Sequence, residues 1–383
     1  MLDGIFAFIL LDTANMRDFI GRDTYGVGPL FKLITDDGFL AVCSEGKGFL
    51  EIKTSMSTPA KITPFPPGHF EVFDLKLTGK VQSLQMDRFH CCTEELKHAS
   101  FNNLEGLGTG FELETVKSNI RILFEDAVKK RLMAHRRIGC LLSGGLDSSL
   151  VAATLVKLAK EEQLQYCIQM FSIGAEDSPD AVAARKVAAH IKSEHHEVNF
   201  TPEEAIRVLE DVIFHLESYD ITTVCASVEM YLISKYIREK TDSVVLFSGE
   251  GLDELTQGYF HKDGVEKHLL RESFKDLNLI PDEILWRKEA FSDGMTSQKK
   301  PWYISLQEHI ESEVNDSQLE NASKLFPFNP PTTKVGFFII RQIFEKYYPG
   351  RSEWTPHYWM PRWIKATDPS ARTLSIYKPD KDQ

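Results

Sequence analysis

The chain has 383 residues, of which 42% are hydrophobic and 26% are charged, an ordinary balance for a globular protein rather than a disordered one. This length is enough for two domains, each with a buried core of its own. The formal net charge of −12 argues against a nucleic-acid-binding platform, which normally presents a basic face.

The cysteines and the apolar runs indicate the compartment. None of the six cysteines forms a C-x-x-C pair, so we expect reduced thiols, as in a cytosolic protein. The longest early apolar run, Ile5 to Leu11, is too short to span a bilayer. Asp3 precedes it, where a signal peptide carries basic residues. We therefore expect a cytoplasmic protein that binds neither membrane nor nucleic acid.

Residues 1–92 predict a β-rich domain. Short apolar runs between Gly, Pro and Asp breaks predict strands at 5–11, 19–23, 39–43 and 70–73. We expect the first of these strands, Ile5 to Leu11, to be buried. Because the chain starts directly on this strand, we interpret the domain as part of a sheet with an unpaired edge, which predicts poor solubility. Polar residues and glycines in the stretch 93–113 predict a linker.

Strands and helices alternate in the domain 114–383. An apolar helical face begins at Val116 and recurs through Leu132. Predicted strands cover 138–142, 167–173, 196–200 and 243–247, and predicted helices begin at 149 and cover 181–191, 203–216 and 228–238. This alternation predicts an α/β fold with a doubly wound parallel sheet. Ligands of such sheets bind beyond the carboxyl ends of the strands, where two glycine loops lie.

The strongest signal is a glycine loop directly after a predicted strand, Ser143-Gly144-Gly145-Leu146-Asp147-Ser148. Its glycines let successive backbone N–H groups cradle a phosphate, and the positive end of the following helix lies at the same place. Asp147 is suited to hold the Mg²⁺ that accompanies a polyphosphate. The loop lacks the G-x-x-x-x-G-K-[ST] pattern and has the form of a pyrophosphate loop, which serves cleavage of ATP to AMP and pyrophosphate. The alternative is an ordinary turn between strand and helix.

A second glycine loop follows another predicted strand and reads Ser248-Gly249-Glu250-Gly251-Leu252-Asp253-Glu254. It carries three carboxylates within five residues, and like charges this close need a cation or a functional use. Asp253 is a candidate to complete the Mg²⁺ site with Asp147, and Glu250 is a candidate to act on a substrate proton. A solvated acidic turn is the alternative.

A third candidate motif begins at Lys288 and ends at Gly294. A lysine here would neutralise charge on phosphate oxygens during adenylyl transfer, although a plain surface lysine is the alternative. The histidines show no H-x-x-x-H pattern, so a zinc site has no support. We interpret His195 and His196 as packing or surface residues.

Four motifs in the same order resemble asparagine synthetases of the glutamine-hydrolysing, animal type. They are Gly139–Ser149, Phe247–Gly251, Lys288–Gly294 and Trp359–Trp363, and the likeness runs from Met1 almost to the C-terminus. The resemblance implies that 114–383 is a domain of the ATP-pyrophosphatase (adenine nucleotide α-hydrolase-like) type. It implies that 1–92 is part of a β-rich glutaminase domain of the N-terminal-nucleophile class.

The resemblance also implies a reaction. The side-chain carboxylate of aspartate attacks the α-phosphate of ATP, which gives β-aspartyl-AMP and pyrophosphate. Ammonia then displaces AMP to give asparagine. The implied substrates are thus ATP with Mg²⁺, aspartate and ammonia.

Site residues follow from the same resemblance. The loop Ser143–Ser148 binds pyrophosphate, and Asp147 and Asp253 hold Mg²⁺. Glu250 supports formation or aminolysis of the intermediate, and Lys288 stabilises the pentavalent transition state. The residues next to the adenosine are Leu141, Ile173, Ser248 and Gly249.

Several positions depart from the family pattern. Family members begin, after removal of Met, with a cysteine that attacks glutamine, whereas Leu2 follows Met1 here. The resemblance therefore implies that glutamine hydrolysis is lost and that the chain is at most ammonia-dependent. Between Lys262 and Asp263 the family has a long segment with an R-V-P-F-L-D stretch, and a proline normally precedes Lys288. The substituted positions are Gly28 and Cys225, where the family has Arg, and Leu252, where it has Ser.

Three interpretations remain open. The first is an ammonia-dependent asparagine synthetase. The second is a truncated isoform or degenerate copy without catalysis, which binds ATP or a full-length partner. The third is a different pyrophosphate-loop ligase, such as a β-lactam synthetase or an argininosuccinate-type enzyme, and the further motifs argue against it. Because the family forms dimers, a homodimer and a heterodimer with a full-length synthetase are both open.

Overall fold

The computed structural model describes residues 4–55, 58–90, 112–256, 261–262, 265–286, 308–309, 313–328, 330 and 338–352. The chain divides into two compact units. The N-terminal unit comprises Met1–Ser100 with Phe344–His357, and the α/β unit comprises Phe101–Ile343 with Tyr358–Gln383. The expected linker lies outside the described residues except for its last two positions.

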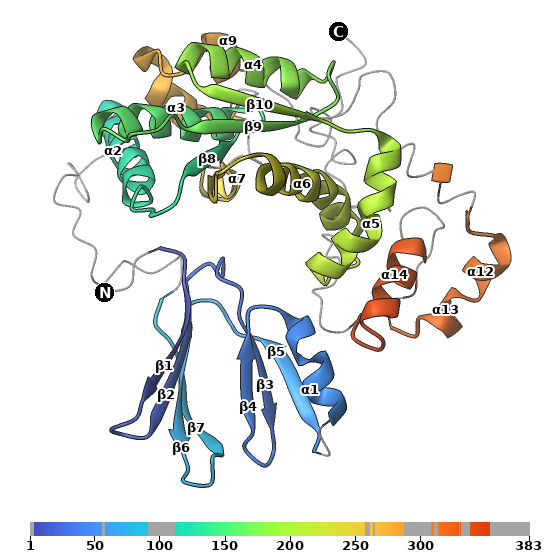
Figure 1. Cartoon of the computed structure of the whole chain (residues 1–383). Coiled ribbons are helices and arrows are strands. Elements are labelled where there is room, and N and C mark those ends of the chain that lie inside the picture. Colours follow the sequence, from blue (N-terminus) through green and yellow to red (C-terminus); the bar gives the residue numbers. More distant parts are fainter. Residues whose placement is uncertain are drawn as a thin grey trace. The chain divides into compact units, whose positions relative to one another are not determined.

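Two antiparallel sheets form the N-terminal unit (Figure 1). The first has the strand order β1-β2-β6-β7 and the second β4-β3-β5. Strands β1, β2, β4 and β6 match the four predicted ones, whereas β3, β5 and β7 were not predicted. The bounds are β1 Ala7–Asp12, β2 Arg17–Arg22, β3 Phe31–Thr35, β4 Leu40–Cys43, β5 Ala60–Pro64, β6 His69–Leu75 and β7 Val81–Arg88, with a short 3-10 helix Gly46–Phe49 and helix α1 Leu50–Ser55.

A buried ion pair links these two sheets beside their small apolar core. Lys32 of β3 contacts the Glu71 carboxylate of β6 at 2.5 Å. The same ammonium lies 5.9 and 5.6 Å from the ring centroids of Phe65 and Phe73, which belong to the core. Removing one partner of such a pair would leave an uncompensated buried charge, so the pair fixes how the sheets pack.

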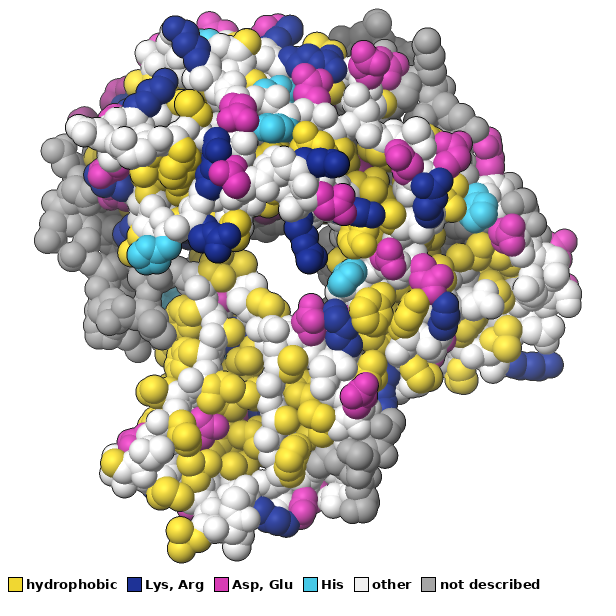
Figure 2. Space-filling model, in the orientation of Figure 1, with side chains coloured by type: hydrophobic (Ala, Val, Ile, Leu, Met, Phe, Trp, Pro, Cys, Tyr) yellow, Lys and Arg dark blue, Asp and Glu magenta, His cyan; other side chains and the backbone are white. Residues whose placement is uncertain are grey.

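Strand β1 is not buried, contrary to the expectation for Ile5 to Leu11. It is an edge strand that pairs with β2 along its whole length, and no described strand pairs with its other side. Ile9, Leu10 and Leu11 are therefore 51%, 59% and 58% exposed. Figure 2 shows apolar side chains gathered on the visible face of the N-terminal unit. The prediction was wrong because an apolar run does not reveal which other strands will cover it.

The α/β unit contains a sheet of four parallel strands in the order β10-β9-β8-β11, which confirms the predicted fold class (Figure 1). Its strands are β8 Ile138–Leu141, β9 Gln169–Gly174, β10 Glu194–Asn199 and β11 Val245–Phe247. The long helices are α2 Leu113–Lys130, α3 Leu146–Glu161, α4 Pro179–Ile191, α5 Pro202–Leu216 and α6 Ile221–Lys240. The later elements are α7 Leu252–Leu255, the hairpin β12 His261–Lys262 and β13 Val265–Glu266, α8 His268–Phe274, a 3-10 helix Lys275–Leu277, α9 Asp282–Leu285, α12 Asp316–Glu320, α13 Ala322–Leu325 and α14 Ile339–Tyr347.

Helices cover both faces of this sheet, as a parallel sheet requires. Ile138 and Cys140 of β8 pack in one apolar cluster with the buried faces of α3 and α4. Phe171 and Ile173 of β9 pack with Ile233 of α6 in a second cluster. Figure 1 shows α3 and α4 on one face of the sheet and α6 on the other. An apolar cluster on each face is what a doubly wound sheet requires, because helices cover both of its faces.

Four of the six cysteines lie among the described residues. Cys43, Cys140, Cys167 and Cys225 carry free thiols, as expected of reduced cysteines. Burial raises the pKa of the Cys140 thiol to about 12, which keeps this group protonated and unreactive. None of the described helices is long and apolar enough to cross a membrane.

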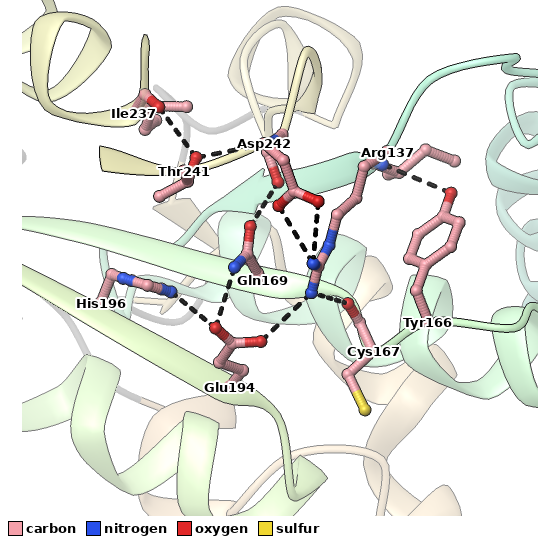
Figure 3. Close-up of polar contacts among 11 residues, drawn as sticks. Arg137, Tyr166, Cys167, Gln169, Glu194, His196, Ile237, Thr241 and Asp242 are labelled. Atoms are coloured by element: carbon pink, nitrogen blue, oxygen red, sulfur yellow. Dashed lines mark hydrogen bonds and ion pairs between the residues drawn. The ribbon is translucent and has the colours of Figure 1, made fainter. Parts of the chain in front are cut away.

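A polar network joins the four parallel strands at their amino ends (Figure 3). Arg137, just before β8, donates to the Asp242 carboxylate at 3.0 and 3.1 Å and to the Cys167 carbonyl at 3.2 Å. It also donates to the Glu194 carboxylate at 3.2 Å, which accepts a further hydrogen bond from Gln169 at 2.8 Å. Because these residues precede or begin the four strands, the network fixes the sheet edge opposite the glycine loops.

The carboxyl edge of the sheet contains the point where a ligand is expected. The chain runs from β8 outward through β9 to β10 and then returns across β8 to form β11. β8 therefore lies between β9, the next strand along the chain, and β11, which forms after the chain has returned, and doubly wound sheets bind ligands at such a switch point. Both glycine loops emerge here, since Ser143 follows β8 and Ser248 follows β11.

Candidate active site

The first glycine loop turns sharply between β8 and α3. Gly144 has a φ of +80°, and a Cβ at this position would lie 2.5 Å from the Ala184 nitrogen and 2.6 Å from the Ala183 Cβ. Only glycine adopts this positive φ without strain and also leaves this space empty. Gly145 is the N-cap of α3, and no side chain among the described residues caps it. The N–H groups of the first turn therefore remain available to an anion.

Two serines brace this loop from its ends. The hydroxyls of Ser143 and Ser148 are 2.9 Å apart, and the Ser143 N–H donates to Ser148 Oγ at 3.2 Å. The Gly145 N–H donates to Ser143 Oγ at 3.3 Å. These bonds hold the loop in one conformation, which lowers the ordering cost of binding a phosphate.

The second glycine loop touches the first through backbone atoms. A Cβ on Gly249 would lie 2.7 Å from the Ser148 nitrogen and 2.8 Å from the Asp147 carbonyl carbon. The Glu250 N–H donates to Ser248 Oγ at 3.2 Å. The two loops were expected to form one site, and the close approach at Gly249 brings them together.

Asp147 and Asp253, from the helices that follow the two loops, meet at one lysine. Lys267 Nζ forms a short hydrogen bond with Asp147 Oδ2 and lies 2.7 Å from Asp253 Oδ1. The Lys267 side chain is only 7% exposed, against 43% for Asp253. The two carboxylates that were predicted to share a cation therefore face a common positive charge.

Burial raises the pKa of Asp147 above its ordinary value. The charge and hydrogen bond of Lys267 act against this rise, whereas the negative charge of Asp253 adds to it. Arg271, itself 2% exposed, also lowers the pKa of Asp147 by its charge. Because the pKa stays raised, the surroundings do not fully compensate the Asp147 carboxylate, and a further cation would interact with it favourably.

These residues fit a divalent cation. Asp147 Oδ1 is buried and has no hydrogen-bond partner in the part of the chain that the structure describes. Within that same part, no three His, Cys, Asp or Glu side chains form a metal-binding group by themselves. Mg²⁺ is usually held by one or two carboxylates together with phosphate oxygens. Asp147 and Asp253 therefore suit a metal that arrives with a polyphosphate.

Two of the residues predicted to contact adenosine, Leu141 and Ile173, lie on the neighbouring strands β8 and β9, and the other two, Ser248 and Gly249, lie on the loop after β11. Leu141 at the end of β8 pairs with Phe171 of β9 and packs, half-buried, against the apolar cluster that contains Ile173. Ile173 is 7% exposed, so its side chain is mostly enclosed by protein. Leu141 therefore offers the larger apolar surface at this edge of the sheet.

The remaining predicted residues differ in what they offer a ligand. Glu250 is exposed on the second loop, which suits a group that meets a substrate. Leu146 is buried in the core at 6% exposure, so only its backbone N–H is available to a phosphate. Lys288 and the motif around it lie outside the described residues.

Two notable residues were not predicted. Lys267 lies 120 residues from Asp147 in the sequence, and no spacing rule connects them. Glu229 lies in α6 and is 3% exposed, and burial, with the nearby charge of Asp180, raises its pKa to about 8. The only sequence signal for Glu229 was a carboxylate next to Val228 on the apolar side of a helix.

The chain is similar to known proteins of one enzyme family. A family model described as asparagine synthase matches residues 119–265 and 260–367, and one described as a glutamine amidotransferase domain matches residues 1–51. The glutamine-hydrolysing asparagine synthetases of Bos taurus and Homo sapiens are 58% and 57% identical to the chain over 442 aligned positions. Each comparison covers 99% of this chain and 79% of the relative.

The comparison also bears on the expected internal deletion. The 442 aligned positions exceed the 383 residues of the chain by 59, so the relatives have residues where this chain has none. The two stretches matched by the asparagine synthase model meet at residues 260–265, next to the expected deletion after Lys262. Among solved structures, NMN synthetase from Francisella tularensis is 16% identical with a TM-score of 0.33, over 66% of this chain and 100% of that one, too low to support an argument. The family matches are sufficient: the chain belongs to the glutamine-hydrolysing asparagine synthetase family.

Proposed function

We propose that this chain catalyses the ATP-dependent synthesis of asparagine from aspartate. The observation that carries the proposal is the pairing of Asp147 and Asp253 from two glycine loops at the switch point between β8 and β11. An open helix start and a preformed glycine loop lie beside these carboxylates. This combination suits ATP accompanied by Mg²⁺.

We assign each set of protein residues to the part of ATP that its chemistry suits. The backbone of Ser143–Ser148 takes the phosphates that leave as pyrophosphate, because its N–H groups and helix start favour an anion. Mg²⁺, held by Asp147 and Asp253, supplies positive charge to the phosphate oxygens. The adenosine part is assigned to Leu141, Ile173, Ser248 and Gly249.

In the first step, the side-chain carboxylate of aspartate attacks the α-phosphorus of ATP. The bond from that phosphorus to the bridging oxygen breaks, pyrophosphate leaves, and β-aspartyl-AMP remains. Lys288 is assigned to the negative charge on the oxygens around the pentavalent phosphorus, as a lysine positioned there would stabilise it.

In the second step, ammonia attacks the acyl carbon of β-aspartyl-AMP and AMP leaves with the electron pair of the broken C–O bond. The attacking nitrogen loses a proton, and we assign its acceptance to Glu250. The exposed carboxylate of Glu250, on the loop that touches the first glycine loop, supports this role.

Free ammonia is the nitrogen donor that we propose for these 383 residues. The support comes from Gly28, which stands where the family has Arg. A Cβ on Gly28 would lie 2.7 Å from the carbonyl carbon and oxygen of Phe6, so the local backbone leaves no room for the family's side chain. We infer that glutamine is not hydrolysed by the part of the amidotransferase domain present here.

A pyrophosphate-release assay with ATP and Mg²⁺ tests the proposal, with aspartate, ammonia and glutamine each added or omitted. We expect pyrophosphate release to depend on aspartate, and asparagine to form with ammonia but not with glutamine. Release that does not depend on aspartate would contradict the ligase activity. Equal asparagine formation from glutamine would contradict only the choice of nitrogen donor.

A second candidate function is a chain that binds ATP without completing the reaction, alone or paired with a full-length synthetase. It is favoured by the positions of the relatives that have no counterpart here. Cys225 and Leu252, which replace the family's Arg and Ser, favour it as well. ATP binding without any aspartate-dependent pyrophosphate release would support this candidate, and normal turnover by the purified protein would exclude it.

A further inference from the structure

Lys267 is held between two carboxylates by the fold around it. It is the N-cap of α8 and has a φ of +52°, a left-handed conformation that non-glycine residues adopt at an energetic cost. Its side chain is 7% exposed, and its ammonium contacts both Asp147 and Asp253. A strained backbone and a buried charge persist together only where the surrounding contacts over-determine them.

The ammonium engages the same carboxylates that are proposed to hold Mg²⁺. Lys267 Nζ lies 2.7 Å from Asp253 Oδ1 and closer still to Asp147 Oδ2. Mg²⁺ requires carboxylate oxygens at about 2.0–2.1 Å. A metal ion on these oxygens would therefore meet the ammonium at a distance where both size and like charge exclude it.

The charges around Asp147 and Asp253 explain when Mg²⁺ can replace the Lys267 ammonium. Arg271 is paired with Glu266 at 3.3 Å and acts on Asp147 only by its charge, whereas Lys267 contacts both Asp147 and Asp253 directly. Mg²⁺ without nucleotide would add two positive charges beside a lysine. The phosphates of ATP bring enough negative charge to retain both the metal and the ammonium.

We propose that Lys267 is a built-in counter-ion that occupies the metal position until a nucleotide arrives, so that Mg²⁺ binds with ATP and only weakly without it. The inference rests on the proposed metal role of Asp147 and Asp253. Lys267 is thereby a positioning residue: it keeps the two glycine loops together in the nucleotide-free protein.

Binding of Mg²⁺ alone, measured by calorimetry on the full chain, tests this inference. Lys267→Met leaves two carboxylates without their cation, so we expect it to bind Mg²⁺ at least about tenfold more tightly than the wild type. Lys117→Met is the matched control. Lys117 is 12% exposed and bridges Glu114 at 3.0 Å and Glu272 at 3.4 Å, so its removal takes the same charge from a similar setting. We expect no change in Mg²⁺ affinity for this control.

Thermal unfolding gives a second measurement that does not depend on activity. Lys267→Met should lower Tm through repulsion between Asp147 and Asp253, and Mg²⁺ alone should restore it. Lys117→Met should lower Tm without recovery by Mg²⁺. If Lys267→Met does not fold, Lys267→Gln is measured in the same two assays, because glutamine keeps a hydrogen-bond donor without the charge.

The outcomes separate this inference from the proposed function. Equal Mg²⁺ affinity of the wild type and both Lys267 variants would overturn the counter-ion role, while ATP-dependent Mg²⁺ binding that requires Asp147 would leave the metal site standing. ATP-dependent Mg²⁺ binding that survives in Asp147→Asn would overturn the metal role and the inference with it.

Discussion

Gly144 and Gly251 both have a left-handed backbone, but only Gly144 is enclosed by neighbouring atoms. Its absent side chain leaves room for Ala183 and Ala184 of α4, whereas a Cβ on Gly251 would meet nothing within 4 Å. We expect Gly251→Ala to cost about 1–2 kcal/mol of unfolding free energy, from backbone strain alone. Gly144→Ala should cost roughly 2–5 kcal/mol, because overpacking adds to the same strain.

Urea unfolding of the two variants, followed by circular dichroism, measures this difference. ATP affinity should fall in Gly144→Ala, since the loop must shift to admit the methyl group. Equal destabilisation by the two substitutions would mean that the contact with α4 is not tight.

Glu229 predicts a pH dependence of stability. Its folded pKa is about 8, against an ordinary value of 4.5, so the folded state keeps this proton to higher pH than the unfolded state. Raising the pH from 4.5 through 8 therefore favours unfolding, by about 2–3 kcal/mol between pH 5 and 7. Glu229→Gln should remove this loss and stabilise the protein at neutral pH.

Unfolding free energies of wild type and variant across this pH range check the prediction. Glu239→Gln is the matched control, because Glu239 is an exposed carboxylate on the same helix, α6. If the unfolding free energy of Glu229→Gln falls with pH as steeply as that of the wild type, another group is responsible for the pH dependence.

Candidate site residues can be proposed from the sequence where their chemistry is local. The glycine loop and its following helix predict a phosphate site. The two loop sequences by themselves also led to the expectation that Asp147 and Asp253 share a cation. Lys267 was not predictable, because only the tertiary structure brings the start of α8 to Asp147 of α3 and Asp253 of α7. The burial of Glu229 likewise depends on tertiary packing and not on its neighbours in sequence.

At the scale of elements, the amino ends of the parallel strands depend on Arg137. Substitution by Met leaves the carboxylates of Glu194 and Asp242 without this partner, so we expect a loss of about 2–3 kcal/mol in unfolding free energy. ATP affinity should not change, because the network lies at the edge opposite the glycine loops. Arg136→Met, at an exposed neighbouring position, should change stability by less than about 0.5 kcal/mol.

Chemical denaturation and ATP titration of both variants test this assignment. A large loss of ATP affinity in Arg137→Met at temperatures where the variant is folded would show that the two sheet edges are coupled.

Elements were predictable where their hydrophobic pattern is strong. Strands β8, β9 and β11 are mostly apolar because both faces of the sheet are covered there. Ser178 and Pro179 mark the start of helix α4, and the Ala181 N–H donates to Ser178 Oγ at 3.2 Å. Strand β7, from Val81 to Arg88, was missed because most of its residues are exposed and polar. Such an edge strand forms through pairing with β6 and carries little signal of its own.

At the scale of the whole molecule, the exposed edge strand β1 predicts association between molecules. Ile9, Leu10 and Leu11 combine high exposure with a strand edge that no described strand pairs with, and no charge interrupts them. Leu10→Lys should therefore increase the soluble yield and delay aggregation in light-scattering measurements. Leu77→Lys adds the same charge at a residue that is 98% exposed and outside any strand, and it should help much less.

The fold class followed from the alternation of strands and helices, but the strand order did not. Only the return of the chain across β8 to form β11 creates the switch point, and a linear pattern carries no record of it. The sequence thus predicted that the two glycine loops belong to one candidate site, and the structure adds why they meet.

Transfer of oxygen from aspartate to AMP tests the central claim most directly. Aspartate labelled with ¹⁸O in its side-chain carboxylate is incubated with ATP, Mg²⁺, ammonia and the purified chain, and AMP is analysed by mass spectrometry. Attack of that carboxylate on the α-phosphorus predicts one ¹⁸O in each AMP and one retained in each asparagine. AMP without label, or no AMP at all, would contradict a β-aspartyl-AMP intermediate in this protein.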